Sequence, residues 1–254
     1  MSRTLLLRAG GTGAVLLAWQ LLGMTGVLGP AIAPPAQIVA GVLDDGTAFY
    51  GSHVPVTLAT AAAGYVWGNL IAIACASLVL VVPWLERLVL QVGIASACVP
   101  LIAIAPILAA CFNGPMTSAI MAAVSVFFTT LVSAVGGLRR ADPGCRDIVR
   151  AYGGGRFLEL RKVRLLAALP DILTALKIAV PAAMLGAVIG EFMGQERGLG
   201  SALVAAQQAS DVVRTWGVTL VSSLIAGVAF LAVGAVERVA VPWAGGGSDE
   251  GGAA

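Results

Sequence analysis

The chain has 254 residues, of which 59% are hydrophobic and 11% are charged. A soluble domain carries about 25% charged residues, so this composition excludes an ordinary soluble protein and predicts an integral membrane protein. The net charge of +2 is small and says little about partners, and we expect no nucleic acid among them.

Six apolar runs are long enough to cross a bilayer, because a hydrocarbon core of about 30 Å needs about 20 helical residues. They cover residues 12–29, 57–82, 88–112, 116–138, 171–193 and 215–236. Their length and their lack of alternating polarity exclude a membrane β-barrel. The expected fold class is therefore an all-α membrane protein with about six transmembrane helices.

The connections between these runs differ in character. Residues 30–55 should form an outer segment that contains a short surface helix at 37–43. The sequence Asn-Gly-Pro at 113–115 predicts a tight turn, so the third and fourth spans should form a hairpin. A second outer segment, 194–214, should contain a turn at 198–200.

These runs and connections divide the chain into three parts. The tail is rich in glycine and acidic residues and is expected to be disordered. The parts are a first span with its outer segment (1–56), a core of spans two to six (57–241) and the tail (242–254).

One polar stretch, 139–170, holds eight of the fifteen Lys and Arg residues. A basic loop between spans stays in the cytoplasm, so this stretch orients the molecule. With the N-terminus inside, twelve Lys and Arg residues lie on the cytoplasmic side, and only Arg197 and Arg214 lie outside. Lys177 falls within the fifth span and is expected to extend its ammonium to the cytoplasmic interface. Both termini should be cytoplasmic.

Motifs for phosphate cradles and metal-dependent catalysis are missing from the sequence. It contains neither Gly-x-x-x-x-Gly-Lys nor His-Glu-x-x-His, and its one histidine is His53. The four cysteines form no Cys-x-x-Cys pair and no metal-binding spacing. We expect no enzymatic activity, no metal and no cofactor in this chain.

Several residues inside the apolar runs are candidates for a translocation path. An intramembrane carboxylate usually faces protein or water, and proline permits a kink. Glu191 could equally be a gate or a buried group that fixes the outer loop. Hydrogen bonding between helices would explain the amide side chains, Asn69 and Gln91. The candidates are Asn69, Gln91, Pro100, Pro106 and Glu191.

The basic stretch should contain two short amphipathic helices, at 145–152 and 156–166, separated by three glycines. Residues 169–170, Leu-Pro, then lead into the fifth span. Such helices suit insertion into a groove on a partner protein. A basic amphipathic surface lying on anionic lipid is the alternative.

At this stretch the sequence resembles a known family. Asp147-Ile148-Val149, then Gly153, then Val163-x-Leu165-Leu166 nine residues later is similar to the EAA loop of ABC-transporter permeases. That loop has Glu-Ala-Ala, Gly and Ile-x-Leu-Pro at these spacings. This chain departs from it with Asp147 in place of Glu, Ile148-Val149 in place of Ala-Ala and Leu166 in place of Pro. Further likeness lies at Pro34–Gln37, Val99–Pro106, Phe127–Leu138 and Gly190–Gly200, and points to the nitrate/sulfonate/taurine group.

The resemblance implies a type I ABC importer permease fold in a bacterial inner membrane. It also implies a homodimer, two ATPase subunits that bind ATP, and an external solute-binding protein. The transported solute stays open, and a non-transporting membrane scaffold or anchor is the alternative function. The loop that would couple to the ATPase comprises Asp147, Ile148, Val149, Tyr152, Gly153, Gly154, Gly155, Val163 and Leu165.

Overall fold

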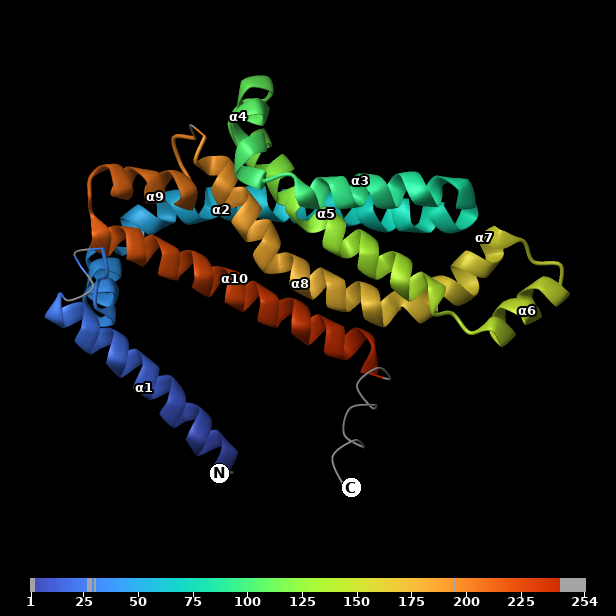
Figure 1. Cartoon of the computed structure of the whole chain (residues 1–254), viewed down its shortest axis with the longest axis horizontal. Coiled ribbons are helices and arrows are strands. Elements are labelled where there is room, and N and C mark those ends of the chain that lie inside the picture. Colours follow the sequence, from blue (N-terminus) through green and yellow to red (C-terminus); the bar gives the residue numbers. More distant parts are fainter. Residues whose placement is uncertain (1–2, 27–28, 30, 194, 243–254) are drawn as a thin grey trace.

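The computed structural model describes residues 3–26, 29, 31–193 and 195–242, and within these ranges it is helical with no β-strand (Figure 1). The predicted disordered tail lies almost wholly outside the described residues. The elements are α1 (Arg3–Thr25), α2 (Pro35–Val81), the 3-10 turn η1 (Pro83–Leu85), α3 (Glu86–Cys98), α4 (Leu101–Cys111), α5 (Pro115–Arg139), α6 (Pro143–Ala151), α7 (Arg156–Glu159), the π-helical turn η2 (Leu160–Arg164), α8 (Leu165–Glu191), α9 (Leu199–Gln208) and α10 (Val212–Ala240).

Four described helices are long and apolar enough to cross a membrane, and α3 with α4 adds a fifth if that bent pair is one span. The four are α2, α5, α10 and the continuous helix formed by α7, η2 and α8. The first predicted span corresponds to α1 up to Thr25, but Val27 and Leu28 lie outside the described residues. The count of six therefore stays a prediction.

Helix α5 is the centre of the bundle, since α8 and α2 both pack along it. Glycines on the two neighbours allow this close approach. A Cβ on Gly64 or Gly68 would overlap the backbone of Ala123 on α5, and one on Gly186 would overlap Met121. These glycines of α2 and α8 therefore serve helix packing within this chain. Helix α10 covers α8 and α2, and α9 lies at the opposite end of the molecule from α6 (Figure 1).

The third predicted span, 88–112, is divided into two helices by a sharp bend at its first proline. The chain bends by 98° between α3 and α4, where Val99 is extended and Pro100 precedes α4. Proline disfavours helical geometry in the residue before it and has no N–H to continue the helix, which explains the break. The expected turn at Asn113-Gly114-Pro115 is confirmed: Gly114 has φ +51°, and Pro115 begins α5.

Two helices begin earlier than the spans predicted for them. The second span was expected to begin near residue 57, but α2 runs from Pro35 with one non-helical residue, Gly46 (φ +63°). The predicted surface helix is the part of α2 before Gly46. The fifth span was expected to begin after Pro170, but the helix continues from Arg156 through Pro170, because packing in a bundle tolerates proline inside apolar helices.

Candidate functional site

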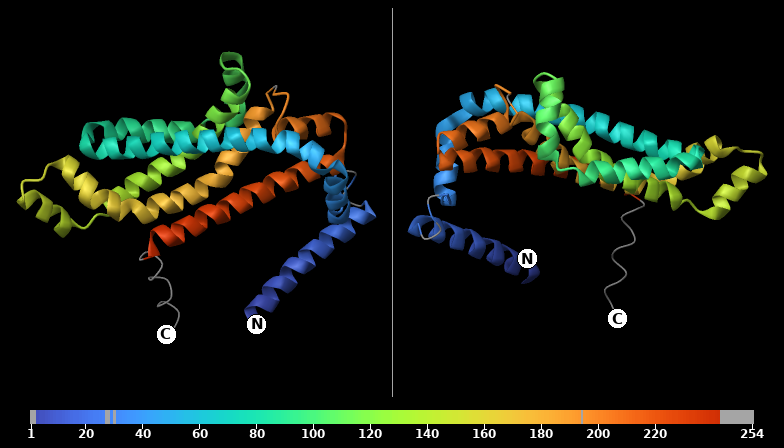
Figure 2. Two further views of the ribbon diagram at one scale, coloured as in Figure 1. Left: turned by 180° about the vertical axis from the view of Figure 1, so that it is seen from behind. Right: turned by 45° about the horizontal axis from the view of Figure 1, so that its top comes forward.

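The polar stretch forms a loop at one extreme end of the molecule, beyond the ends of α5 and α8 (Figure 2). Helix α6 confirms the predicted first short helix. It begins at Pro143, and the Asp142 side chain accepts a hydrogen bond from the Cys145 backbone N–H at 3.2 Å. This N-cap satisfies an amide that the first helical turn leaves without a partner. The carboxylate also accepts from the Cys145 thiol, which raises the pKa of Cys145.

The glycines after α6 end the helix in a defined geometry. Gly153 has φ +80°, its N–H donates to the Arg150 carbonyl at 2.9 Å, and the Gly154 N–H donates to the Val149 carbonyl at 2.9 Å. These two bonds form a Schellman motif, in which glycine is the residue that adopts the left-handed conformation without strain. A Cβ on Gly154 would lie 2.7 Å from the Val149 oxygen, whereas Gly155 has open space around it. The three glycines therefore have different roles.

Helix α6 presents two different faces. Arg146 and Arg150 are one turn apart and point toward Glu159 on α7. On the opposite side, Ile148 and Tyr152 are 59% and 89% exposed. Phe157, on α7, is 68% exposed. Large apolar side chains exposed on a polar loop are typical of a surface that another protein covers.

Glu159 is the group that holds this loop together. Its side chain is only 3% exposed and accepts hydrogen bonds from three arginines. The nearest donor distances are 2.8 Å for Arg146, 3.1 Å for Arg150 and 2.6 Å for Arg164. Arg146 and Arg150 belong to α6, whereas Arg164 belongs to the helix that continues as α8. The carboxylate therefore connects α6 to a long membrane helix.

The sequence prediction missed Glu159 and its arginines. One signal was present, since Glu159 is the only acidic residue in 151–170. The predicted coupling residues divide into two groups. Asp147, Ile148, Tyr152, Gly153 and Gly155 are exposed, while Val149, Gly154, Val163 and Leu165 are half-buried. Leu165 packs against the membrane bundle.

A second polar cluster lies at the opposite end, around Glu191. This carboxylate is 1% exposed and accepts hydrogen bonds from the Gly200 N–H at 2.7 Å and from the Thr57 hydroxyl at 3.0 Å. Thr57 in turn accepts from the Leu199 N–H at 2.7 Å. The end of α8, the middle of α2 and the first turn of α9 are thereby joined. Gly198 has φ +136° and makes the turn, while Leu199 and Gly200 already belong to α9, which corrects the predicted three-residue turn.

Comparison with known proteins decides the family. Residues 68–243, more than half of the chain, match the family described as "Binding-protein-dependent transport system inner membrane component". The chain belongs to this family of ABC-importer permeases. The expected resemblance is thereby confirmed.

Three relatives agree with this membership. A "Probable ABC transporter permease protein" of Haemophilus influenzae is 31% identical over 201 residues, covering 79% of this permease and 82% of the relative. The formylaminopyrimidine transport permease protein ThiX of Halalkalibacterium halodurans is 28% identical, covering 84% and 86%. SsuC of Bacillus subtilis, named for aliphatic sulfonates, is 26% identical, covering 91% and 85%.

The predicted path residues of this permease do not meet at one place. Asn69 is buried between α2 and α5, where it accepts from Thr130 at 2.6 Å and donates to the Tyr65 carbonyl at 2.7 Å. It lies twelve residues, about 18 Å, along α2 from the Thr57 that contacts Glu191. Gln91, Pro100 and Pro106 are exposed on α3 and α4. Their roles in transport stay predictions.

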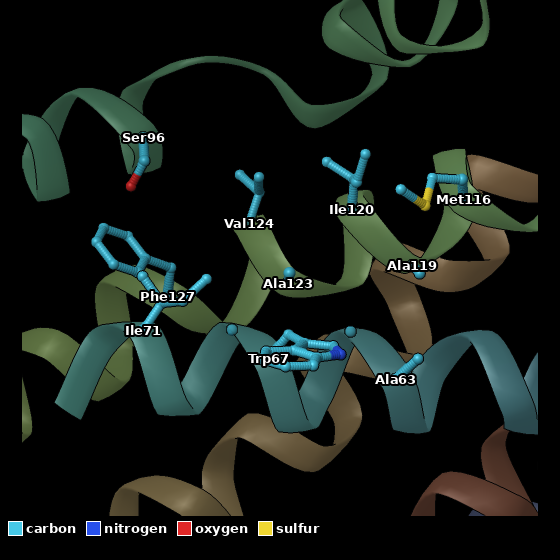
Figure 3. Close-up of a pocket in the computed structure, with 12 residues that line it drawn as sticks. Ala63, Trp67, Ile71, Ser96, Met116, Ala119, Ile120, Ala123, Val124 and Phe127 are labelled. Atoms are coloured by element: carbon cyan, nitrogen blue, oxygen red, sulfur yellow. The ribbon is translucent and has the colours of Figure 1, made fainter. Parts of the chain in front are cut away.

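An apolar groove of about 450 Å³ runs along the surface where α2, α3 and α5 meet (Figure 3). Trp67 and Phe127 lie in it from α2 and α5, and Ser96 faces it from α3. None of the five predicted path residues lines this groove. Its apolar lining suits contact with lipid or another helix better than contact with a polar solute.

Lys177 is paired in the structure. Its ammonium lies 3.1 Å from a carboxylate oxygen of Glu237 on α10, which also accepts from Thr174 at 2.6 Å. Glu237 lies near the end of α10, and an opposite charge on a neighbouring helix makes Lys177 less costly inside the membrane than an isolated charge would be. That Lys177 extends to the cytoplasmic interface stays a prediction.

Proposed function

We propose that this chain is the path-forming permease subunit of an ATP-driven importer and that α6 is its coupling element. The family membership supports the transport role. The observation that carries the coupling role is the arrangement of α6, with an exposed apolar face on one side and two arginines tied to Glu159 on the other. One face can bind a partner while the other transmits its movement.

The partners we propose follow from the family description and from the loop. An external solute-binding protein delivers the solute, two ATPase subunits bind ATP and receive Ile148, Tyr152 and Phe157 in a groove, and a second copy of this chain completes the path. This chain itself would hold no cofactor. The twelve Lys and Arg residues on one side support a bacterial inner-membrane protein of six spans with both termini and the loop in the cytoplasm.

Movement of α6 would reach the membrane helices through two connections. Glu159 and Arg164 link α6 to α8, and residues 140–142 link it to α5. Helices α5 and α8 meet at Gly186 and Gly190, which have no side chains that could interlock with α5. The two helices could therefore slide past each other by a small shear movement. ATP binding can drive this shift only if the ATPase pair binds α6 more tightly in one of its two states.

We propose a small solute of the nitrate, sulfonate or taurine type or a vitamin precursor. The named relatives support this range, since one is named for formylaminopyrimidine and another for aliphatic sulfonates. Selectivity would come mostly from the external binding protein.

The loop glycines provide a matched test of coupling. In the reconstituted complex, Gly154→Ala should reduce solute-stimulated ATP hydrolysis about tenfold or more, because its Cβ collides with the Val149 carbonyl and distorts the end of α6. Gly155→Ala should have a much smaller effect on hydrolysis, since nothing in this chain lies within 4 Å of its Cβ. Equal activity of the two variants would contradict the coupling role, and a chain that copurifies with no ATPase would instead indicate a scaffold.

A further inference from the structure

A small cavity of about 190 Å³ lies between the membrane helices and the loop, on the side of α6 away from its exposed apolar face. Its volume is below the range of about 300–1,000 Å³ typical of pockets for drug-sized ligands, so it suits a small group. The end of α2, the start of α3 and the α6–α7 segment form its walls. The lining residues are Val79, Leu80, Glu86, Arg150, Arg156, Glu159, Leu160 and Arg164.

The charges around this cavity do not balance. Three arginines and two glutamates line it, but both carboxylates are already engaged by arginines. Glu159 is shared by Arg150, Arg164 and also Arg146, and Glu86 pairs with Arg139. The three lining arginines, with Arg139 and Arg146 that pair with the same carboxylates, thus bring five positive charges against two negative ones. Like charges held this close repel one another unless an anion lies among them.

Arg156 is the lining arginine that remains free to bind a ligand. It is exposed, and within the described part of the chain no carboxylate lies within ion-pair distance of it. Guanidinium groups bind phosphate oxygens in a bidentate manner, which an ammonium cannot do. The apolar side of the cavity, formed by Val79, Leu80 and Leu160, is continuous with helices that would lie in the bilayer.

We propose that this cavity binds a phosphate-type anion through Arg156 together with Arg150 and Arg164. The anion neutralises the excess charge behind α6 and stabilises the position of the loop against α2 and α3. The headgroup of an anionic phospholipid and free inorganic phosphate both supply this chemistry. The site goes beyond the transport function and does not depend on turnover, so it can be tested on the purified full-length chain.

The test uses Arg156→Gln with Arg161→Gln as the matched control, because Arg161 is exposed on the same helix but does not line the cavity. Native mass spectrometry measures retention of phosphatidylglycerol against phosphatidylcholine. In parallel, thermal unfolding in lipid-free detergent measures stabilisation by millimolar inorganic phosphate against chloride at equal ionic strength.

In the wild type and in Arg161→Gln we expect one of these two anions to bind, and in Arg156→Gln we expect its affinity to fall at least tenfold. Arg156→Lys should recover only part of it, since the bidentate contact is lost. Retention of phosphatidylglycerol would identify a lipid, and stabilisation by phosphate alone would identify the free anion; both support the site. Binding of neither anion, or equal loss in Arg156→Gln and Arg161→Gln, would overturn it.

Discussion

The guanidinium of Arg146 on α6 donates to the carboxylate of Glu159 on α7 at 2.8 Å, across thirteen residues of sequence. The same carboxylate oxygen accepts two bonds from Arg164, so one buried atom joins the exposed loop helix to the helix that continues as α8. A partner that moves α6 would therefore move α8 with it.

Replacing Glu159 with glutamine should loosen this connection. The amide would keep the volume of the side chain but leave three arginines without their counter-charge, at a cost of about 1–3 kcal/mol. We expect faster amide hydrogen exchange throughout α6 and reduced solute-stimulated ATP hydrolysis. Glu86→Gln is the control, because its pair with Arg139 is much more exposed and should contribute below about 1 kcal/mol. Unchanged amide hydrogen exchange in α6 would show that Glu159 does not hold α6 in place.

Close contact between α5 and α8 should depend on Gly186. A methyl group there would lie 2.7 Å from the Met121 carbonyl oxygen, so Gly186→Ala should destabilise the protein by about 1–3 kcal/mol. A methyl group added at Gly227, on α10, would meet nothing within 4 Å. Gly227→Ala should be neutral or slightly stabilising. Thermal unfolding of both variants in one detergent checks this, and an equal Tm would contradict the proposed packing.

The junction of α8, α2 and α9 should depend on Glu191. Replacing it with alanine removes the acceptor for the Gly200 N–H and for the Thr57 hydroxyl, so the first turn of α9 should exchange its amide protons at least tenfold faster. Glu196→Ala, in the exposed part of the same connection, should not change this exchange. If both variants behave alike, the carboxylate does not hold α9, and a role in the transport path alone becomes the better explanation.

Labelling of Cys145 tests the orientation of the loop. In a variant whose other three cysteines are serine, a membrane-impermeant maleimide should react with Cys145 in inverted vesicles and not in intact cells. Cys145 is exposed and free, so burial would not prevent the reaction. Reaction from outside intact cells would overturn the proposed topology.

The pH dependence of that reaction follows from Asp142. Its carboxylate raises the pKa of Cys145, so less of the reactive thiolate is present at a given pH below that value. Asp142→Asn should lower the pKa and speed labelling near neutral pH, with the difference vanishing at high pH, where both thiols are ionised. Asp147→Asn, on the same helix, is the control. A rate that is insensitive to Asp142 would show that the thiol does not contact it.

Much of the fold could be predicted from the sequence. Long apolar runs require helices in a bilayer, whichever neighbours they meet, so the all-α class and the position of the polar loop follow from composition. Helix α6 and its end at Gly153 were also predictable, because N-capping and a left-handed glycine are properties of a few consecutive residues.

The tertiary structure decided where polar side chains lie and where helices break or continue. Pro100 ends α3 with a sharp bend, whereas Pro170 is accommodated in a continuous helix, although both prolines lack the same N–H group. The partner of Lys177 is 60 positions away in the sequence, a partner of Glu191 is 134 positions away, and a partner of Glu159 is 13 positions away. Local sequence determines the geometry of a turn. The partner of a buried charge depends instead on which helices meet, and the small residues at the contacts of α2, α5 and α8 determine which helices can do so.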